Sequence, residues 1–363
     1  MTRRIDQWVP ALHRGDAIGD SAVLMRDALR SWGFTSDIYT YNQDPGTHAV
    51  PFERWSEGAE DDVVMFHYAL ISPMNEAFTR LRCRRVLQFH NITPPHFFAE
   101  WDKEIYRILN KGLEGLAPLA PHTTLGLGDS EFNRIDLEHL GFGRTGVLPI
   151  AIDFDRYKGP GNPILRKRLD DRRVNLLFVG RIAPNKRHDL LLRVLAYYKK
   201  HISSGVRLLA VGKHPRRETG HGVPIDAHYL DALGRLGQFL GLETGDAVFT
   251  DGVTHDELLA YYEGSHVFLS MSEHEGFGVP LVEAMIKRVP VVAWSGTAVG
   301  ETLGGAGLQF DTQDIATFAE AAASVARPGS AREAVLRAQD RRAQDFATAT
   351  TLAKLRAIVE SLA

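Results

Sequence analysis

The sequence predicts two α/β domains, each built on a doubly wound parallel sheet. Short apolar runs alternate with helical patterns along both halves of the chain, and a polar stretch rich in glycine and proline separates the halves. The 363 residues also exceed what one hydrophobic core usually serves. Because strands that alternate with helices form a parallel sheet covered on both faces, we expect two such sheets.

The first half is predicted to form a domain of residues 1–155. β-branched and aromatic residues predict its strands, which are residues 5–9, 36–41, 63–68, 86–90, 123–127 and 146–148. Apolar residues at helical spacing predict its helices, which are residues 21–32, 73–81, 100–116 and 131–140. A linker is expected at residues 150–173, where glycines and prolines interrupt a polar stretch.

The second half is predicted to form a domain of residues 156–344. Its predicted strands are residues 174–180, 207–212, 247–250, 266–270 and 290–294. Thr254 and Glu257 have the spacing of a capping box, which predicts the start of a helix. Residues 331–363 lack glycine and proline, so we expect that tail to be helical throughout.

Composition excludes several classes of protein. Lysine and arginine number 42 against 45 acidic residues, so the chain lacks the strongly basic character of a nucleic-acid binder. Cys83 is the only cysteine, which excludes an internal disulfide and fits a reducing compartment. No apolar run approaches the roughly 20 residues of a membrane span. We therefore expect a cytoplasmic protein without a nucleic-acid partner.

The segment FVGRIAPNK, residues 178–186, predicts an anion site. A buried strand is expected to end at Gly180, and Arg181 and Lys186 flank the turn that follows. Ligands of doubly wound sheets bind beyond the carboxyl ends of the strands, where these two cations would meet a diphosphate. The alternative is a solvated basic loop.

The segment SEHEGFGVPLVEAM, residues 272–285, predicts the other half of that site. A helix is expected to begin near Val279, so the amides of residues 276–279 lie at the positive end of its dipole. Glu275 and Glu283 carry carboxylates that could accept hydrogen bonds from sugar and ribose hydroxyls. The alternative is a helix-capping Glu275 and a solvated Glu283.

The stretch EGFGVPLVE, residues 275–283, resembles the E-x7-E motif of the retaining glycosyltransferases of family 4, and GRIAPNK resembles their phosphate-binding loop. This resemblance implies the GT-B fold, in which two Rossmann-like domains face a central cleft. It implies that residues 345–363 return to complete the acceptor-binding N-terminal domain, and that residues 156–344 bind the nucleotide sugar. It further implies transfer of a hexosyl unit, with retention, from a nucleoside-diphosphate sugar to an acceptor hydroxyl.

The resemblance also assigns the site residues. Residues implied in catalysis are Glu275, Arg181, Lys186 and His90. Residues implied in donor binding are Gly15, Asp16, Gly180, Arg181, Lys186, Glu275, Gly276, Phe277, Gly278, Val279 and Glu283. Gly15 and Asp16 match the position of a phosphate loop without its paired glycines, and Ser295-Gly296 replaces a second glycine pair. For His90, a structural role is the alternative.

No cofactor and no metal are expected. Asp153 and Asp155 form a D-x-D pattern, but they lie in the linker, and Arg181 and Lys186 already supply positive charge. The donor is predicted to be GDP-mannose or a UDP-hexose, and the acceptor a glycan, a lipid-linked or a small molecule. A sugar-nucleotide epimerase or hydrolase, and a non-catalytic nucleotide-sugar-binding protein, remain alternatives.

Peripheral membrane contact is a further alternative for the first half. Arginines cluster at Arg80, Arg82, Arg84 and Arg85, and Phe97, Phe98 and Trp101 are expected near the same sheet edge. Such a cluster is typical of a solvated face, but together with these aromatic residues it could touch anionic lipid at the inner face of the membrane.

Overall fold

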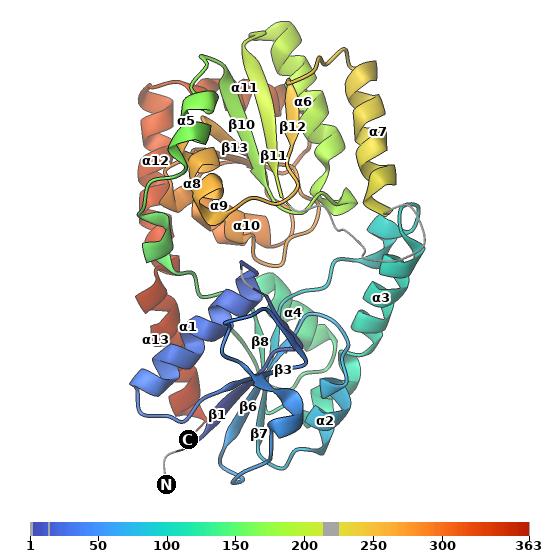
Figure 1. Ribbon diagram of the computed structural model, residues 1–363, viewed down its shortest axis with the longest axis vertical. Coiled ribbons are helices and arrows are strands. Elements are labelled where there is room, and N and C mark those ends of the chain that lie inside the picture. The colour runs from blue at the N-terminus through green and yellow to red at the C-terminus, as the bar shows by residue number, and fades with distance from the viewer. Residues whose placement is uncertain (1–2, 14, 213–224, 363) are drawn as a thin grey trace. The chain divides into compact units, whose positions relative to one another are not determined.

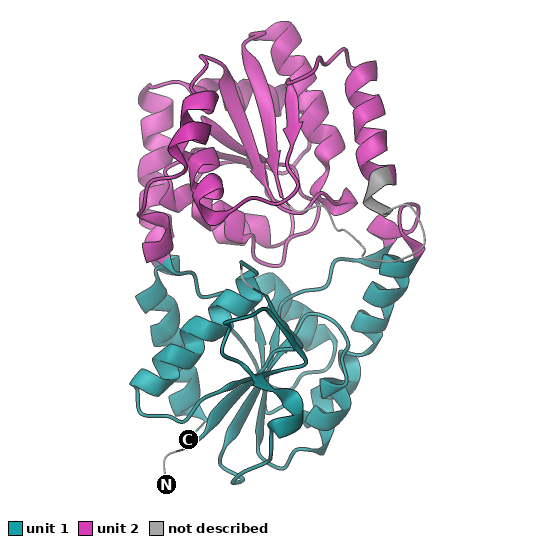
Figure 2. Ribbon diagram, viewed as in Figure 1, with its two compact units in different colours: residues 1–95, 104–153, 345–363 teal, residues 96–103, 154–344 magenta. Residues whose placement is uncertain are grey.

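The computed structural model describes residues 3–13, 15–212 and 225–362 (Figure 1). The chain divides into two compact units (Figure 2). Unit 1 comprises residues 1–95, 104–153 and 345–363, and unit 2 comprises residues 96–103 and 154–344. Residues 345–363 thus return to the first unit, whereas the assignment of residues 96–103 to the second was not predicted.

Unit 1 is a parallel sheet with strand order β5-β3-β1-β6-β7-β8-β9. Its strands are β1 (Ile5–Trp8), β3 (Ile38–Thr40), β5 (Val50–Pro51), β6 (Val63–Tyr68), β7 (Arg84–Phe89), β8 (Leu125–Gly128) and β9 (Thr145–Val147). Its helices are α1 (Ala17–Ser31), α2 (Met74–Arg80), α3 (Lys103–Glu114), α4 (Glu131–His139) and α13 (Thr348–Ser361). The two-residue strands β2 (Ala11–Leu12) and β4 (Asn42–Gln43) form a separate parallel pair.

The core of unit 1 lies on both faces of this sheet. Strand β6 is buried along its whole length, and its successive side chains enter opposite cores because strand residues alternate in direction. Phe66 packs with Trp8 in one core, and Met65 packs with Leu355 in the other. Since Leu355 belongs to α13, the C-terminal helix is part of this core, beside α1 (Figure 1).

Unit 2 is a second parallel sheet, with strand order β12-β11-β10-β13-β14-β15. Its strands are β10 (Val174–Val179), β11 (Val206–Val211), β12 (Ala247–Phe249), β13 (Val267–Ser270), β14 (Val291–Trp294) and β15 (Leu308–Phe310). Its helices are α5 (Pro163–Leu169), α6 (His188–His201), α7 (Ile225–Phe239), α8 (His255–Glu263), α9 (Val279–Ile286), α10 (Ala298–Leu303), α11 (Ile315–Ala326) and α12 (Ser330–Ala343). The predicted capping box of Thr254 and Glu257 is confirmed at the start of α8.

The segment predicted as a linker, residues 150–173, contains the passage from unit 1 to unit 2 after Asp153, but the rest of it is folded into unit 2. The segment contains a short 3-10 helix at Phe154–Tyr157 and the helix α5, which Asn162 caps through its side chain. Gly161 lies so close to α8 that a Cβ atom there would be 2.2 Å from the amide nitrogen of Ala260. Glycine and proline here serve close packing and helix initiation, and not a free connection.

The C-terminal tail is helical but interrupted. Helix α12 ends at Ala343, a 3-10 helix covers Gln344–Phe346, and α13 begins at Thr348. The interruption coincides with the passage from unit 2 to unit 1 at residue 345. The Thr348 hydroxyl donates to the carbonyl of Ile152 at 2.6 Å, which fixes the start of α13 within unit 1.

The aromatic residues and the arginines of the predicted membrane patch belong to different units. Trp101 belongs to unit 2, where its ring lies edge-on to Tyr229 at 5.0 Å, and Phe98 is buried. Arg82 and Arg85, in contrast, lie in unit 1 and have protein partners there. Within the described residues, no helix is long and apolar enough to span a membrane.

Candidate active site

The candidate site lies at the carboxyl ends of β10 and β13 in unit 2. These strands are neighbours, and β11 and β13 flank β10 on either side. After β10 the chain adds β11 and β12 on one side and then crosses back to place β13 on the other. Doubly wound sheets bind ligands at such a switch point, beyond the strand ends. Both predicted motif segments follow these two strands, so the structure brings them together as expected.

The first motif loop is fixed where it leaves β10. The amide of Gly180 donates to the carbonyl of Val211 at 2.9 Å. A Cβ atom on Gly212 would lie 1.9 Å from the carbonyl oxygen of Gly180, so the ends of β10 and β11 touch through their backbones. Arg181 follows with an exposed side chain, and no hydrogen bond or ion pair to another described residue is found for it.

Asn185 joins the two motif loops, a role that sequence reasoning missed. Its side-chain amide donates to the backbone carbonyl of His274 at 3.2 Å, and its backbone carbonyl accepts from the backbone amide of Glu273 at 2.8 Å. Only 2% of Asn185 is exposed. The signal that could have revealed this role is an amide side chain between a proline and a lysine, because a buried amide needs hydrogen-bond partners.

Lys186 and Glu275 meet directly. Lys186 Nζ lies 2.6 Å from Glu275 Oε1, and the two side chains are 14% and 17% exposed. An ammonium has three donors and a carboxylate has several acceptor positions, so each group keeps hydrogen-bonding capacity for a ligand. The predicted phosphate-binding cation and the predicted sugar-binding acid are therefore one ion pair in this structure.

Thr297, which follows β14, holds the backbone of Glu275. Its hydroxyl accepts from the amide of Glu275 at 3.0 Å. Thr297 has φ +52° and ψ −134°, a conformation that costs a β-branched residue about 1–3 kcal/mol. Thr297 directly follows Ser295-Gly296, which replaces the expected glycine pair. The backbone at Thr297 thus has a conformation that favours glycine, although the residue is threonine.

The second motif loop enters α9 as predicted, at Val279. Gly278 has φ +87° and precedes the helix, so a residue with a side chain would be strained there. Phe277 is buried, and its carbonyl accepts from the Thr302 hydroxyl at 2.5 Å. The Phe277 side chain is therefore packed inside the protein. A ligand here would instead contact the backbone of the loop and the amide groups at the positive end of α9.

Glu283 is buried, so the alternative of a solvated Glu283 is wrong. One carboxylate oxygen accepts from the Tyr262 hydroxyl at 2.6 Å, and the other accepts from the Tyr157 hydroxyl. Burial raises the pKa of the Glu283 carboxyl above its ordinary value. Tyr157 lies in the segment predicted as a linker, which is why sequence reasoning missed it. The ribose-binding role of Glu283 stays a prediction.

We expect Tyr262→Phe to destabilise unit 2. The substitution removes a hydrogen bond to a buried carboxylate, and leaving such a group partly unsatisfied costs about 1–3 kcal/mol. Thermal unfolding would measure the loss, with Tyr106→Phe, an exposed tyrosine, as the control. Equal melting temperatures for the two variants would show that the Tyr262 hydroxyl does not stabilise Glu283.

The remaining predicted site residues lie in unit 1. Gly15 has φ +73°, and Asp16 caps α1, its carboxylate accepting from the amide of Gly19 at 3.2 Å. The His90 side chain is fully buried, and both ring nitrogens contact protein partners, Asp129 and His67. Their predicted roles toward the donor stay predictions, as do those of Gly180, Arg181 and the residues of the second motif.

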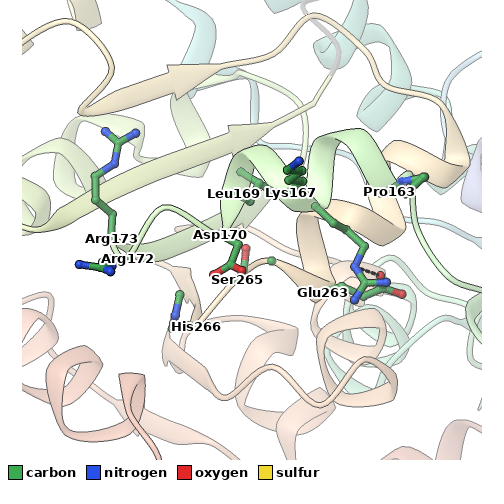
Figure 3. Close-up of a pocket in the computed structure, with 11 residues that line it drawn as sticks. Pro163, Lys167, Leu169, Asp170, Arg172, Arg173, Glu263, Ser265 and His266 are labelled. Carbon is green, nitrogen blue, oxygen red and sulfur yellow. Dashed lines mark ion pairs between the residues drawn. The ribbon is translucent and has the colours of Figure 1, made fainter.

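Figure 3 shows a groove of unit 2 whose lining residues include none of the candidate-site residues. Its walls precede β10 and β13 in the chain and include Lys167, Arg172 and His266. Arg166 pairs there with Glu263 at 3.0 Å. Because parallel sheets bind ligands at the carboxyl edge, this groove is not where the motif residues act.

The aspartates of the D-x-D pattern and Cys83 differ in their surroundings. Asp155 pairs with Lys158 at 2.5 Å and is largely exposed. Within the described residues, no group of three or more histidine, cysteine or acidic side chains is placed to hold a metal ion. Burial raises the pKa of the Cys83 thiol to about 11, which leaves it protonated and unreactive at neutral pH.

In comparisons with known sequences, the second half of the chain is similar to glycosyltransferases. Residues 173–327 match the family model described as "Glycosyl transferases group 1". A GDP-mannose-dependent alpha-(1-6)-phosphatidylinositol monomannoside mannosyltransferase of Mycobacterium tuberculosis is 28% identical over 192 residues, covering 49% of this chain and 46% of that protein. A D-inositol 3-phosphate glycosyltransferase of Geodermatophilus obscurus is 34% identical over 191 residues, covering 50% and 40%. The chain spans less than half the length of these relatives.

Comparison with solved structures confirms the predicted fold. Sucrose-phosphate synthase from Thermosynechococcus elongatus superposes with a TM-score of 0.74 at 16% identity, covering 99% of both chains. Anabaena HepE, in a complex with UDP and glucose, superposes with a TM-score of 0.73 at 16% identity, covering 99% of this chain and all of that one. These likenesses show that both units have the arrangement of strands and helices that the motifs imply.

Proposed function

We propose that this chain, a GT-B protein whose residues 173–327 belong to the glycosyl transferases group 1, transfers a hexosyl unit from a nucleoside-diphosphate sugar to an acceptor hydroxyl. One observation supports this most strongly. At the switch point of unit 2, an exposed arginine, an ion-paired lysine and acid, and the start of α9 gather at two adjacent strand ends. A diphosphate bearing a sugar needs this combination of cations, backbone amides and a hydroxyl acceptor.

In the proposed reaction, the bond between the anomeric carbon and the diphosphate oxygen breaks, and the acceptor's hydroxyl oxygen bonds to the same carbon. The departing diphosphate takes up the hydroxyl proton. Negative charge then develops on the departing diphosphate, and Arg181, Lys186 and the amides of residues 276–279 stabilise it. Glu275 accepts from sugar hydroxyls and Glu283 from the ribose. We propose retention of the anomeric configuration, with no metal ion; the activity should then be the same with and without a chelator.

The donor and the acceptor are also proposals. GDP-mannose and UDP-hexoses are the donors we propose to test, since one relative is named as GDP-mannose-dependent and a structural neighbour holds UDP and glucose. We propose a glycan, a lipid-linked or a small molecule as acceptor, a cytoplasmic location, and weak contact with the inner face of the membrane. The name of the mycobacterial relative includes a lipid acceptor, which supports including lipid-linked acceptors in the test.

Donor consumption, measured with a panel of nucleotide sugars in the presence and absence of an acceptor pool, tests this function. A transferase consumes donor mainly when the acceptor is present. Equal consumption without acceptor would instead indicate a hydrolase or an epimerase. Tight binding of a donor in a thermal-shift assay, without any turnover across the acceptor pool, would indicate a binding protein.

A further inference from the structure

A row of buried polar side chains crosses the sheet of unit 1 near the carboxyl ends of its central strands. Gln7 lies on β1, His67 on β6 and Gln88 on β7, while His90 and Asp129 follow β7 and β8 directly. These four strands are consecutive neighbours in the sheet. Each of these residues is buried or has a buried side chain. Neither the motifs nor the proposed reaction accounts for this row.

Three hydrogen bonds link the row from end to end. His90 Nδ1 lies 2.9 Å from Asp129 Oδ2, and His90 Nε2 lies 2.8 Å from His67 Nδ1. The two imidazole planes are nearly parallel, at 4°, with centroids 5.1 Å apart. Because the two facing nitrogens are only 2.8 Å apart, the rings meet edge to edge and do not stack face to face. His67 Nε2 completes the row at 3.0 Å from Gln7 Oε1.

Both ends of the row are acceptors. The Gln7 amide nitrogen donates to the carbonyl of Ala22 at 3.0 Å, so the amide oxygen must face His67. Asp129 Oδ1 accepts from the Gln88 amide, whose orientation the carbonyl of Leu148 fixes in the same way. An acceptor therefore lies at each end, with four ring nitrogens between them.

Counting protons then determines the charge of the row. Each of the three bonds needs one proton, but two neutral imidazoles beside an ionised carboxylate carry only two. Without the third proton, two lone pairs would face each other at hydrogen-bonding distance inside the protein, where an unmade hydrogen bond is costly. We propose that His67, His90 and Asp129 share three protons. Because an imidazole is ordinarily a stronger base than a carboxylate, the proton between His90 and Asp129 stays on His90, which is held as an imidazolium with Asp129 as its counter-ion.

The surroundings of the row agree with this assignment of charge. Burial and the neighbouring His90 hold the pKa of His67 well below its ordinary value, so His67 is the neutral ring of the pair. The hydrogen bonds of the row involve described residues on or directly after β1, β6, β7, β8 and α1. The titratable groups in these bonds are His67, His90 and Asp129. Gln7 and Gln88 are neutral amides.

The inference deepens the proposed function and rests on it for its chemical consequence. An imidazolium has no free lone pair, and both N–H groups of His90 are already bonded to Asp129 and His67. In this form His90 can therefore supply positive charge, but it can neither remove a proton nor donate a further hydrogen bond. Gln7, His67 and Asp129 are then positioning residues for His90. We expect turnover of the donor to fall at alkaline pH as the row loses its third proton.

Long-range proton–nitrogen NMR on the whole protein, labelled with 15N-histidine, tests the proton count without a substrate. The chain has 15 histidines, so His67→Gln and His90→Gln variants would assign the two signals. At pH 7 we expect both nitrogens of His90 protonated and His67 protonated at Nε2 alone. An ordinary imidazole, with a pKa near 6.5, would be mostly neutral at that pH. A neutral His90 ring in the wild-type protein would overturn the proposal.

Asp129→Asn offers a second test that should preserve the fold. The asparagine oxygen can accept from Gln88 while its nitrogen donates to His90 Nδ1, so two protons then satisfy the whole row. We expect the imidazolium signal to disappear in this variant and to persist in Asp27→Asn, an exposed carboxylate of unit 1. Persistence in both would overturn the proposal. An imidazolium signal in a protein that consumes no donor would instead count against the proposed function alone.

Discussion

Replacing Arg181 or Lys186 by alanine should lower the turnover of donor by ~10²-fold or more. Each side chain is proposed to stabilise charge that develops on the departing diphosphate, and removing one such preorganised group typically has an effect of this size. Arg181→Ala is the cleaner change, because the Arg181 side chain is exposed and no bond to another described residue is found for it. Its melting temperature should therefore equal that of the wild-type protein.

Lys186→Ala needs a closer control, since it leaves Glu275 without its cation. Thermal unfolding would separate a loss of fold from a loss of chemistry. Arg193→Ala, an exposed cation on α6 that follows the same loop, is the matched control and should keep wild-type turnover. If both Arg181→Ala and Lys186→Ala retained turnover within about twofold of the wild type, the proposed donor site would be in the wrong place.

The parts of this fold that could be predicted are those that local sequence encodes. Short apolar runs located β6 and β10, because a parallel strand buried on both faces reads as a nearly continuous apolar run. Likewise, the start of α9 at Val279 follows from two glycines and a proline close by in sequence. The motif loops were found for the same reason, since each is a short segment that carries its own chemistry.

What could not be predicted depends on residues distant in sequence. The burial of Glu283 depends on Tyr157, which is 126 positions away in a segment whose composition resembles a linker. The strain at Thr297 is a property of φ, and a threonine in the sequence does not reveal it. The row through His67 and His90 can be recognised only when the order of four strands in the sheet is known. From the sequence alone, His90 therefore had two alternative roles, one in catalysis and one in the structure.

Gly212→Ala should lower the free energy of unfolding of unit 2 more than most substitutions that add a single methyl group. The added Cβ would lie 1.9 Å from the carbonyl oxygen of Gly180, a backbone atom that no change of rotamer can move. The strands β10 and β11 would have to separate, and forced overpacking of this kind costs about 1–3 kcal/mol or more. Thermal unfolding should show a melting temperature lower by several degrees.

The same substitution should also weaken donor binding, because Gly180 is where the loop bearing Arg181 and Lys186 leaves the sheet. Gly234→Ala is the matched control: Gly234 is exposed in α7, and no atom lies within 4 Å of its would-be Cβ. There alanine should instead stabilise the helix by about 0.5–1 kcal/mol. If Gly212→Ala melted like the wild-type protein and bound donor equally well, then the close approach of these two strand ends would not fix the position of the cationic loop.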